Sequence, residues 1–197
     1  MTDSLKNKRV AVLVTTGFEQ SELFEPRRAL EEAGAQSLVV SIQGGQIRGW
    51  KDGNWGDCID VDLTLDEARD SQFDALMLPG GVINSDRLRL SPNAVSFVRS
   101  FFEAGKPVGA ICHALWMIIE ADVARGLKLT SWPSLQTDLR NAGAEWVDSE
   151  VVVDQGLVTS RGPQDLPAFS RKFLEEISEG RHIQAVIRTI RNGADLI

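Results

Sequence analysis

Runs of apolar residues alternate with helical periodicity along the first part of the chain. Residues 9–15 form a continuous, mainly β-branched run, typical of a strand buried on both faces, and residues 36–42 form another. Between them, apolar residues recur at helical spacing over 21–33, and Gly34 is a stop signal. Pro26 is expected in the first turn of this helix or at a kink. The β-α-β opening predicts a parallel sheet.

The alternation continues to the end of the chain. Further strands are predicted over 73–78, over the apolar run that ends at Ile111, over 127–130, and as a hairpin over 151–159. Further helices are predicted over 65–70, 92–104, 113–121, 134–141, 163–177 and 182–191. The sequence contains no evident internal repeat or linker, so we predict a single domain over 1–180. Residues 181–197 are predicted to form a C-terminal helical extension that packs on the body of the protein or on a partner subunit.

The glycine-rich stretch 44–60 interrupts this pattern. It is predicted to be a loop or an irregular hairpin. Trp50 and Trp55 lie within it. They could mark an oligomer interface, but we favour the simpler interpretation that each covers local core.

Composition narrows the class of protein. The chain has 197 residues, 43% hydrophobic and 25% charged, as in an ordinary globular domain. Its net charge of −7 argues against a direct nucleic-acid-binding surface or binding to an anionic membrane. Residues 1–9 are polar and no apolar run approaches 18 residues, so we predict a cytoplasmic protein without a membrane partner. Cys58 and Cys112 are predicted to be free thiols, and their spacing predicts no metal site.

Cys112 lies between a buried strand and a helix-like segment. Such a turn lifts one side chain above the sheet edge, as the nucleophile elbow of serine hydrolases does. Unpaired N–H groups and the dipole at a helix start favour a thiolate there. A small buried thiol that only fills core space explains the same pattern. This stretch alone leaves both interpretations open.

Three turns that follow strands carry useful chemistry: 17–19, 79–81 and 112–113. If their strands are neighbours, these turns converge at one edge of the sheet. Cys112 would then be the nucleophile, and a partly shielded Glu19 with a raised pKa would shuttle the proton. The N–H groups of Gly81 and His113 would hold an oxyanion. Alternatively, Glu19 only favours a helix start, and the glycine pair only makes a tight turn.

His113 has two possible roles. Its position beside Cys112 suggests a Cys–His dyad, but adjacent side chains seldom point at the same spot, so a backbone role is an equal alternative. The other histidine, His182, lies in the tail. A full triad with a distant histidine is therefore hard to build within this chain.

Several motifs, in order and spacing, resemble those of the DJ-1/PfpI family of intracellular PfpI-like proteases and general stress proteins. They are residues 78–81, 105–108, 110–113, 141–148, 150–154, 159–161 and 165–167. The resemblance spans residues 8–178. It implies a flavodoxin-like α/β sandwich with a mainly parallel sheet, helices on both faces and a cysteine nucleophile elbow. It also implies that Glu19, Cys112 and His113 are the functional residues.

The resemblance also implies a range of activities. Family members are described as cysteine peptidases, as deglycases and glyoxalases acting on small reactive carbonyls or their adducts, and as stress or redox proteins. They form dimers or larger rings. We therefore expect a homo-oligomer, a dimer or larger, whose substrates are small carbonyl compounds or modified proteins.

Three positions depart from the family pattern. Ala114 replaces the usual glycine after the Cys-His pair, which would tighten the elbow or narrow the pocket. Trp132 replaces a tyrosine, so a phenolic donor is lost. Where PfpI peptidases carry an acidic residue after Gly80 and Gly81, this chain has Ser85 followed by Asp86. Asp86 could substitute, but the change weakens the peptidase interpretation.

We therefore predict a cysteine-dependent, hydrolase-type enzyme of the glyoxalase or deglycase kind, in which Cys112 forms a hemithioacetal with a reactive carbonyl. It would need no metal and no organic cofactor. One alternative is an oligomeric intracellular cysteine peptidase. Another is a non-enzymatic redox sensor or stress chaperone, in which Cys112 oxidises to a sulfinate stabilised by protonated Glu19.

Overall fold

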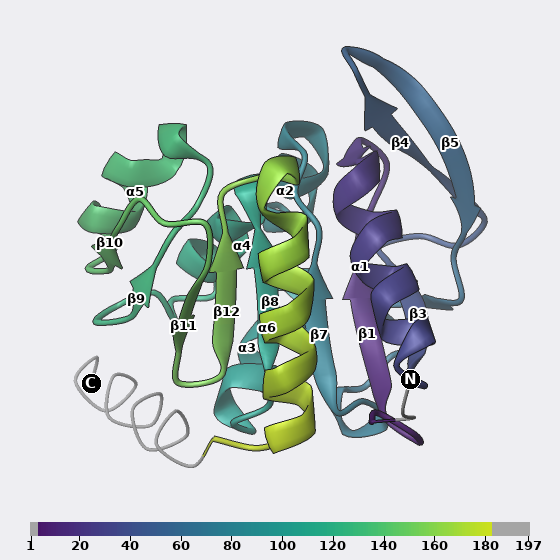
Figure 1. Ribbon diagram of the computed structural model, residues 1–197. Coiled ribbons are helices and arrows are strands. Elements are labelled where there is room, and N and C mark those ends of the chain that lie inside the picture. Colours follow the sequence, from purple (N-terminus) through teal and green to yellow (C-terminus); the bar gives the residue numbers. More distant parts are fainter. Residues whose placement is uncertain (1–3, 183–197) are drawn as a thin grey trace.

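A seven-stranded sheet forms the centre of the protein in a computed structural model that describes residues 4–182 (Figure 1). Side by side, its strands are β11 (Val152–Asp154), β12 (Leu157–Ser160), β8 (Val108–Ile111), β7 (Ala75–Leu78), β1 (Arg9–Leu13), β3 (Gln36–Ser41) and β6 (Leu63–Thr64). All neighbours run parallel except β11 and β12, the predicted hairpin. The predicted parallel α/β fold class is confirmed.

The helices lie on both faces of this sheet. They are α1 (Gln20–Glu32), α2 (Val82–Arg89), α3 (Pro92–Glu103), α4 (Leu115–Glu120), α5 (Gln136–Asn141) and α6 (Leu166–Glu179). Short 3-10 turns span Asp70–Gln72, Cys112–Ala114, Pro133–Leu135 and Pro163–Asp165. Of the helices in the described part of the chain, none is long and apolar enough to cross a membrane.

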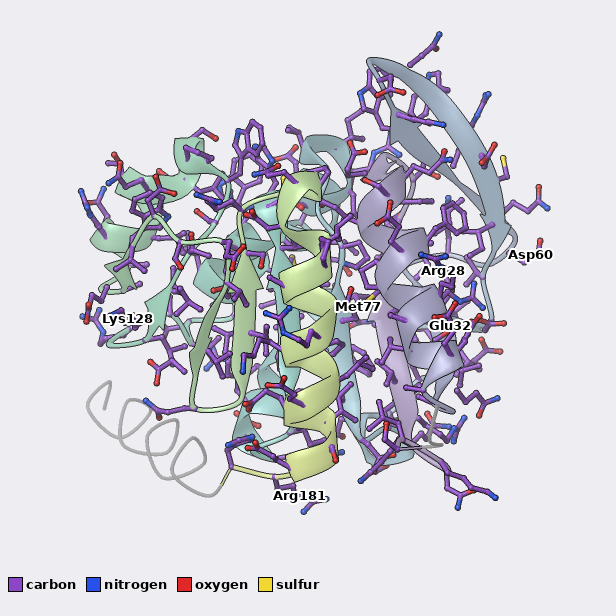
Figure 2. All side chains as sticks on the ribbon, viewed as in Figure 1. Arg28, Glu32, Asp60, Met77, Lys128 and Arg181 are labelled. Atoms are coloured by element: carbon purple, nitrogen blue, oxygen red, sulfur yellow. The ribbon has the colours of Figure 1, made fainter. Side chains whose placement is uncertain are left out.

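Alternate residues of each buried strand feed two separate cores. In β1, Val10 and Val12 pack with α1 and α6, whereas Ala11 and Leu13 pack with α2, α3 and α4 on the other face. Met77 of β7 is labelled at the centre of the sheet in Figure 2 and is fully buried. A strand buried on both faces must be apolar throughout, which is why periodicity identified these strands so clearly.

The order of the strands places a ligand crevice. From β1 the chain moves to β3 on one side, and it then returns to place β7 on the other side of β1, with β8 beyond. Strands β1, β7 and β8 are therefore neighbours, as the predicted convergence of three turns requires. Ligands of such sheets bind at the carboxyl ends of the strands, where the strand order reverses.

The glycine-rich stretch is a true hairpin. β4 (Gln46–Lys51) pairs antiparallel with β5 (Asn54–Asp60), with a register shift between Arg48 and Trp50. Its turn residues Asp52 and Gly53 both have positive φ, 50° and 79°, as a two-residue hairpin turn demands. With β2 (Phe18–Glu19) it forms a small three-stranded sheet that stands beside α1 in Figure 1.

Some sequence predictions do not match the fold. The helix predicted over 65–70 is wrong: the preceding Leu63–Thr64 pairs with β3, so the segment begins extended and has room only for turns. Helix α2 was not predicted. Pro26 lies in the middle of the 13-residue α1 rather than in its first turn. The extension predicted over 181–197, with its helix over 182–191, falls outside the described residues from position 183 onward.

Candidate active site

Cys112 occupies the sharp turn that was predicted. β8 ends at Ile111, and Cys112 follows with φ of +63°, a conformation that non-glycine residues rarely adopt. The chain then enters the 3-10 turn Cys112–Ala114 and helix α4. Such local strain persists only where the surrounding structure fixes it, and it clusters at functional sites. The residue is 6% exposed, so its sulfur lies at the floor of the crevice.

Polar groups surround the Cys112 sulfur on three sides. The backbone N–H groups of Gly81 and His113 lie near it and favour the charged form of the thiol. The Glu22 carboxyl lies beside the sulfur; its Oε2 accepts the Gly80 N–H at 2.9 Å, while its buried Oε1 has no hydrogen-bond partner among residues 4–182. The Nδ1 atom of His113 lies 3.2 Å from the sulfur. The site therefore combines a thiol, a carboxyl and two backbone donors.

The carboxyl beside the thiol belongs to Glu22 rather than to Glu19. Glu19 is the N-cap of α1, and its carboxylate accepts from the Ser21 hydroxyl at 3.4 Å. Glu22 lies in the first turn of the same helix, where the side chain is fully buried against the sheet edge. The sequence analysis named only Glu19 and missed Glu22, because only the path of the helix decides which glutamate reaches the sulfur.

Burial shapes the protonation of this pair. Desolvation, reinforced by the charge of Glu19, raises the pKa of Glu22 to about 8. Desolvation and the nearby Glu22 charge also raise the pKa of the Cys112 thiol, which the Gly81 and His113 N–H groups oppose. As pH rises, the Glu22 carboxyl therefore ionises near pH 8, before the Cys112 thiol does.

Burial also governs the two groups beside this pair. It raises the pKa of the Glu19 carboxyl and lowers the pKa of the His113 imidazole. His113 is therefore a neutral imidazole near pH 7. A neutral ring can accept or donate at Nδ1, depending on its tautomer.

Gly80 and Gly81 allow this close approach. A Cβ on Gly80 would meet Glu22 Oε2 at 2.4 Å and Cys112 Cβ at 2.8 Å. Gly81 has φ of +95°, and a Cβ there would meet the carbonyl oxygen of Gly17 at 2.5 Å. The tight turn, one of the two alternatives left by the sequence, thus also places the Gly80 N–H against the Glu22 carboxyl.

Asn84 is a site residue that the sequence analysis missed. It is fully buried; its Oδ1 accepts the Thr15 N–H at 2.7 Å, and its Nδ2 donates to the carbonyls of Pro79 and Gly80. It therefore ties the end of β1 to the glycine turn. The signal available was its position five residues after Pro79, at the start of an unpredicted helix.

Four residues named from the sequence have different places. Trp132 lines the pocket and stacks on His113, with ring centroids 5.9 Å apart. Ala114 is buried in the core below the elbow. Ser85 is buried as well, and its hydroxyl has no hydrogen-bond partner among residues 4–182. Asp86 is exposed on α2 and is not among the residues lining the pocket.

A pocket of about 420 Å³ opens above Cys112. Its polar floor holds Cys112, His113, Glu19 and Glu22. Its walls are mainly apolar: Gly17, Trp50, Gly81, Val82, Ile83, Trp132 and Pro163. Trp50, interpreted from sequence as local cover, thus contributes to the pocket wall. An apolar pocket with a few convergent polar groups is the usual form of a small-molecule site.

A comparison of the chain with known protein families agrees with the sequence motifs and with the geometry of the site. A model of the DJ-1/PfpI family matches residues 8–176. The chain belongs to this family. It is 45% identical over 169 residues to Protein/nucleic acid deglycase 2 of Escherichia coli, covering 85% of this chain and 96% of that one. It is 44% identical over 167 residues to Deglycase PH1704 of Pyrococcus horikoshii, covering 85% and 98%.

A solved structure shows the same architecture. The crystal structure of Drosophila melanogaster DJ-1beta superposes with a TM-score of 0.79 at 30% identity, covering 93% of this chain and 96% of that one. The flavodoxin-like sandwich expected from the sequence is therefore that of the family.

Proposed function

We propose that this protein is a cysteine-dependent deglycase and glyoxalase that hydrolyses adducts of small dicarbonyls, such as methylglyoxal. The observation that carries the proposal is the Cys112 elbow, whose sulfur lies beside the buried Glu22 carboxyl and near the backbone N–H groups of Gly81 and His113, under an apolar pocket. The names of the E. coli and P. horikoshii relatives support the same chemistry.

The first step makes a carbon–sulfur bond. The Cys112 sulfur attacks the former aldehyde carbon of the adduct, and its proton passes to Glu22. The carbon–nitrogen bond breaks, and the free amine leaves with a proton. With free methylglyoxal the sulfur adds directly to the aldehyde, and the oxygen takes the proton. Both routes give the same hemithioacetal on Cys112.

The second stage releases the acid. Glu22 moves a proton from the first carbon to the second, and the hydroxyl proton on the first carbon passes to the ketone oxygen, so that the first carbon is oxidised to a thioester and the neighbouring ketone is reduced to an alcohol. Water then hydrolyses the thioester, giving lactate and the free thiol. The net reaction of methylglyoxal and water to lactate balances without an external oxidant or reductant. Negative charge on oxygen would be stabilised by the Gly81 and His113 N–H groups.

The remaining pocket groups have supporting roles in this proposal. Glu19 faces the pocket and keeps the Glu22 pKa high by its charge. His113 closes one side of the sulfur with its ring, which is held between Trp116 and Trp132. The apolar walls exclude water from the hemithioacetal until the thioester has formed.

The test is lactate release from a methylglyoxal-treated peptide and from free methylglyoxal. Wild type should turn over both, and Cys112→Ser should lose at least about 1,000-fold in kcat/KM. Cys58→Ser is the matched control, because Cys58 is an exposed thiol on β5, and it should retain full activity. Absence of lactate from the wild type with both substrates would refute the proposal.

One observation favours a second candidate, a peptidase. The contact of 3.2 Å between Cys112 and His113 Nδ1 is that of a Cys–His dyad. Within residues 4–182, however, His113 contacts two tryptophans and has no hydrogen bond to a carboxylate that would orient it. Casein cleavage that depends on both Cys112 and His113, without lactate formation, would establish this alternative.

We also propose that the protein assembles into a homo-oligomer of two or more chains. Helix α2 at the pocket exposes Val82 by 52% and Leu90 by 78% of their surfaces. Large exposed aliphatic side chains of this kind are common at contacts between subunits. Light scattering should give a mass of at least two chains, and a monomer at micromolar concentration would contradict the expectation.

A further inference from the structure

A second cluster of ligand-type side chains lies far from the pocket. The carboxylates of Glu176 and Glu179 and the imidazole of His182 place their ligand atoms within 4.8 Å of one another. They lie at the C-terminal end of α6, which is at the opposite end of the sheet from the Cys112 elbow (Figure 1). Figure 2 labels the neighbouring Arg181 at this end. The proposed deglycase chemistry makes no use of this cluster.

Glu176 is buried and His182 is partly buried, and each has one buried atom that makes no hydrogen bond. Glu176 is 7% exposed, and its Oε2 has no hydrogen-bond partner among residues 4–182. The same holds for His182 Nε2. The two atoms lie 2.9 Å apart, which is an ion-pair distance if the imidazole is protonated, but they do not have the alignment of a hydrogen bond. Buried polar atoms without partners require an explanation, and a shared cation is one.

The backbone holds His182 in place. Glu176 and Glu179 are three residues apart and therefore share one face of α6. Gly180, with φ of +89°, then turns the chain, and the His182 N–H donates to the Gly105 carbonyl at 2.7 Å. The imidazole lies against Gly156, where a Cβ would come within 2.6 Å of Cδ2. The ring thus rests in a niche that only glycine leaves open.

We infer that Glu176, Glu179 and His182 form a binding site for a divalent transition-metal ion, with zinc as the best fit. One imidazole and two carboxylates are ordinary zinc ligands, and the exposed side of the cluster leaves the fourth position to water. Ligands at about 2.0–2.2 Å from one tetrahedral zinc ion lie about 3.4 Å apart. Glu176 and His182 already lie within this separation, and the exposed Glu179 side chain must move by about 1 Å or more to join them.

Metal at this site would fix the chain that leaves α6. It would join the end of α6 to the residues that precede β8 and β12, through the contacts of His182 with Gly105 and Gly156. Binding of an ion to folded protein alone adds stability by mass action. The inference is independent of the proposed activity, since none of these residues lines the pocket.

The test is calorimetric titration of zinc into metal-free, tag-free, full-length protein carrying Cys58→Ser and Cys112→Ser, which removes both thiols as competing ligands. We expect one zinc ion per chain with a Kd of about 10 µM or below. In the same background, His182→Ala and Glu179→Gln should each weaken binding by at least about tenfold. Excess zinc should raise the melting temperature by about 5 °C or more.

Glu175→Gln is the matched control. It removes the same charge from an exposed position on the same helix, where the carboxylate pairs with Lys172 rather than with the cluster. Its zinc affinity should equal that of the parent. A parent Kd above about 100 µM, or equal affinity in His182→Ala and Glu175→Gln, would overturn the inference. Glu179 is exposed, so Glu179→Gln tests the site even if His182→Ala disturbs the fold.

Discussion

Single atoms decide the geometry around the sulfur. The Gly80 N–H, the Glu22 carboxyl and the Cys112 side chain meet where one additional carbon would not fit. The site therefore depends on the absence of a side chain at Gly80 as much as on the polar groups that meet there. The two predictions at the residue scale concern this contact and the proton it shares.

Gly80→Ala should inactivate the protein without unfolding it. Its Cβ would meet Glu22 Oε2, Cys112 Cβ and the Ile111 carbonyl oxygen at 2.4–2.8 Å, so the reacting groups must separate. A displacement of about 1 Å costs on the order of 100-fold in kcat/KM. Gly44→Ala is the control, since its Cβ would make only an ordinary contact of 3.6 Å. Equal lactate formation by both variants would contradict this prediction.

The rate of lactate formation should depend on the ionisation of Glu22. Because its pKa is raised to about 8, the carboxylate that accepts the thiol proton becomes populated as pH rises through 8. We expect kcat/KM to rise about tenfold per pH unit below pH 8 and to level off above it. In Glu22→Gln, kcat/KM should be at least about 100-fold lower and should no longer rise with pH through 8.

Glu19→Gln separates the two glutamates. If Glu22 is the base, this variant keeps the rise in rate, but the midpoint moves to lower pH, because the Glu19 charge helps to raise the Glu22 pKa. If Glu19 were the base, as the sequence analysis expected, Glu19→Gln would abolish the rise. The pH profiles of the two variants therefore decide between the two assignments.

At the scale of an element, the β4–β5 hairpin completes the pocket. Trp50 lines the pocket, and Trp55, across the hairpin, packs against it edge to face with centroids 5.3 Å apart. The hairpin pairs with β2, which directly precedes α1 and Glu22. This element thus connects the pocket wall to the helix that carries the acid.

Trp55→Ala should weaken substrate binding while leaving the chemical step intact. Loss of an aromatic pair is worth about 0.5–1.5 kcal/mol, so the KM for a glycated peptide should rise about 2–10-fold with kcat unchanged. Ile42→Ala is the control, since Ile42 is also a partly exposed apolar residue but does not line the pocket. A fall in kcat of the same size would show that the hairpin acts on the chemistry.

At the scale of the whole molecule, the buried acid has a cost in stability. The folded protein keeps the Glu22 proton up to about pH 8, whereas the unfolded chain loses it near the ordinary carboxyl value of 4.5. Between these values the folded state binds more protons, so the free energy of unfolding falls as pH rises. The active-site proton is thus linked to the stability of the entire domain.

Glu22→Gln should remove this dependence. Relative to the variant, wild type should lose about 2–4 kcal/mol of unfolding free energy between pH 5 and pH 8. Urea denaturation at the two pH values measures it, and other titrating groups cancel in the difference. Glu25→Gln, an exposed change on the same helix, should have the same unfolding free energy as wild type at pH 5 and at pH 8. A constant difference between wild type and Glu22→Gln would show that Glu22 is ionised at both values.

The sequence by itself determined the elements that lie within the sheet and the motifs at their ends. Strands buried on both faces must be apolar, so β1, β3, β7 and β8 were predictable, and so was the turn that carries Cys112. The convergence of three turns followed once parallel neighbours were assumed. Helix α2 was not predictable in this way, because its apolar residues follow no clear helical stripe.

The tertiary structure decided which side chains meet. The sequence analysis named Glu19 as the acid, and only the rotation of α1 against the sheet shows that Glu22 lies beside the sulfur. Tertiary contacts also decide the surroundings of three further features: Asn84, Trp50 and the cluster of Glu176, Glu179 and His182. Their partners lie on other elements or beyond a turn. The local pattern of apolar and polar residues therefore predicts neither these contacts nor the burial that changes the chemistry of the side chains.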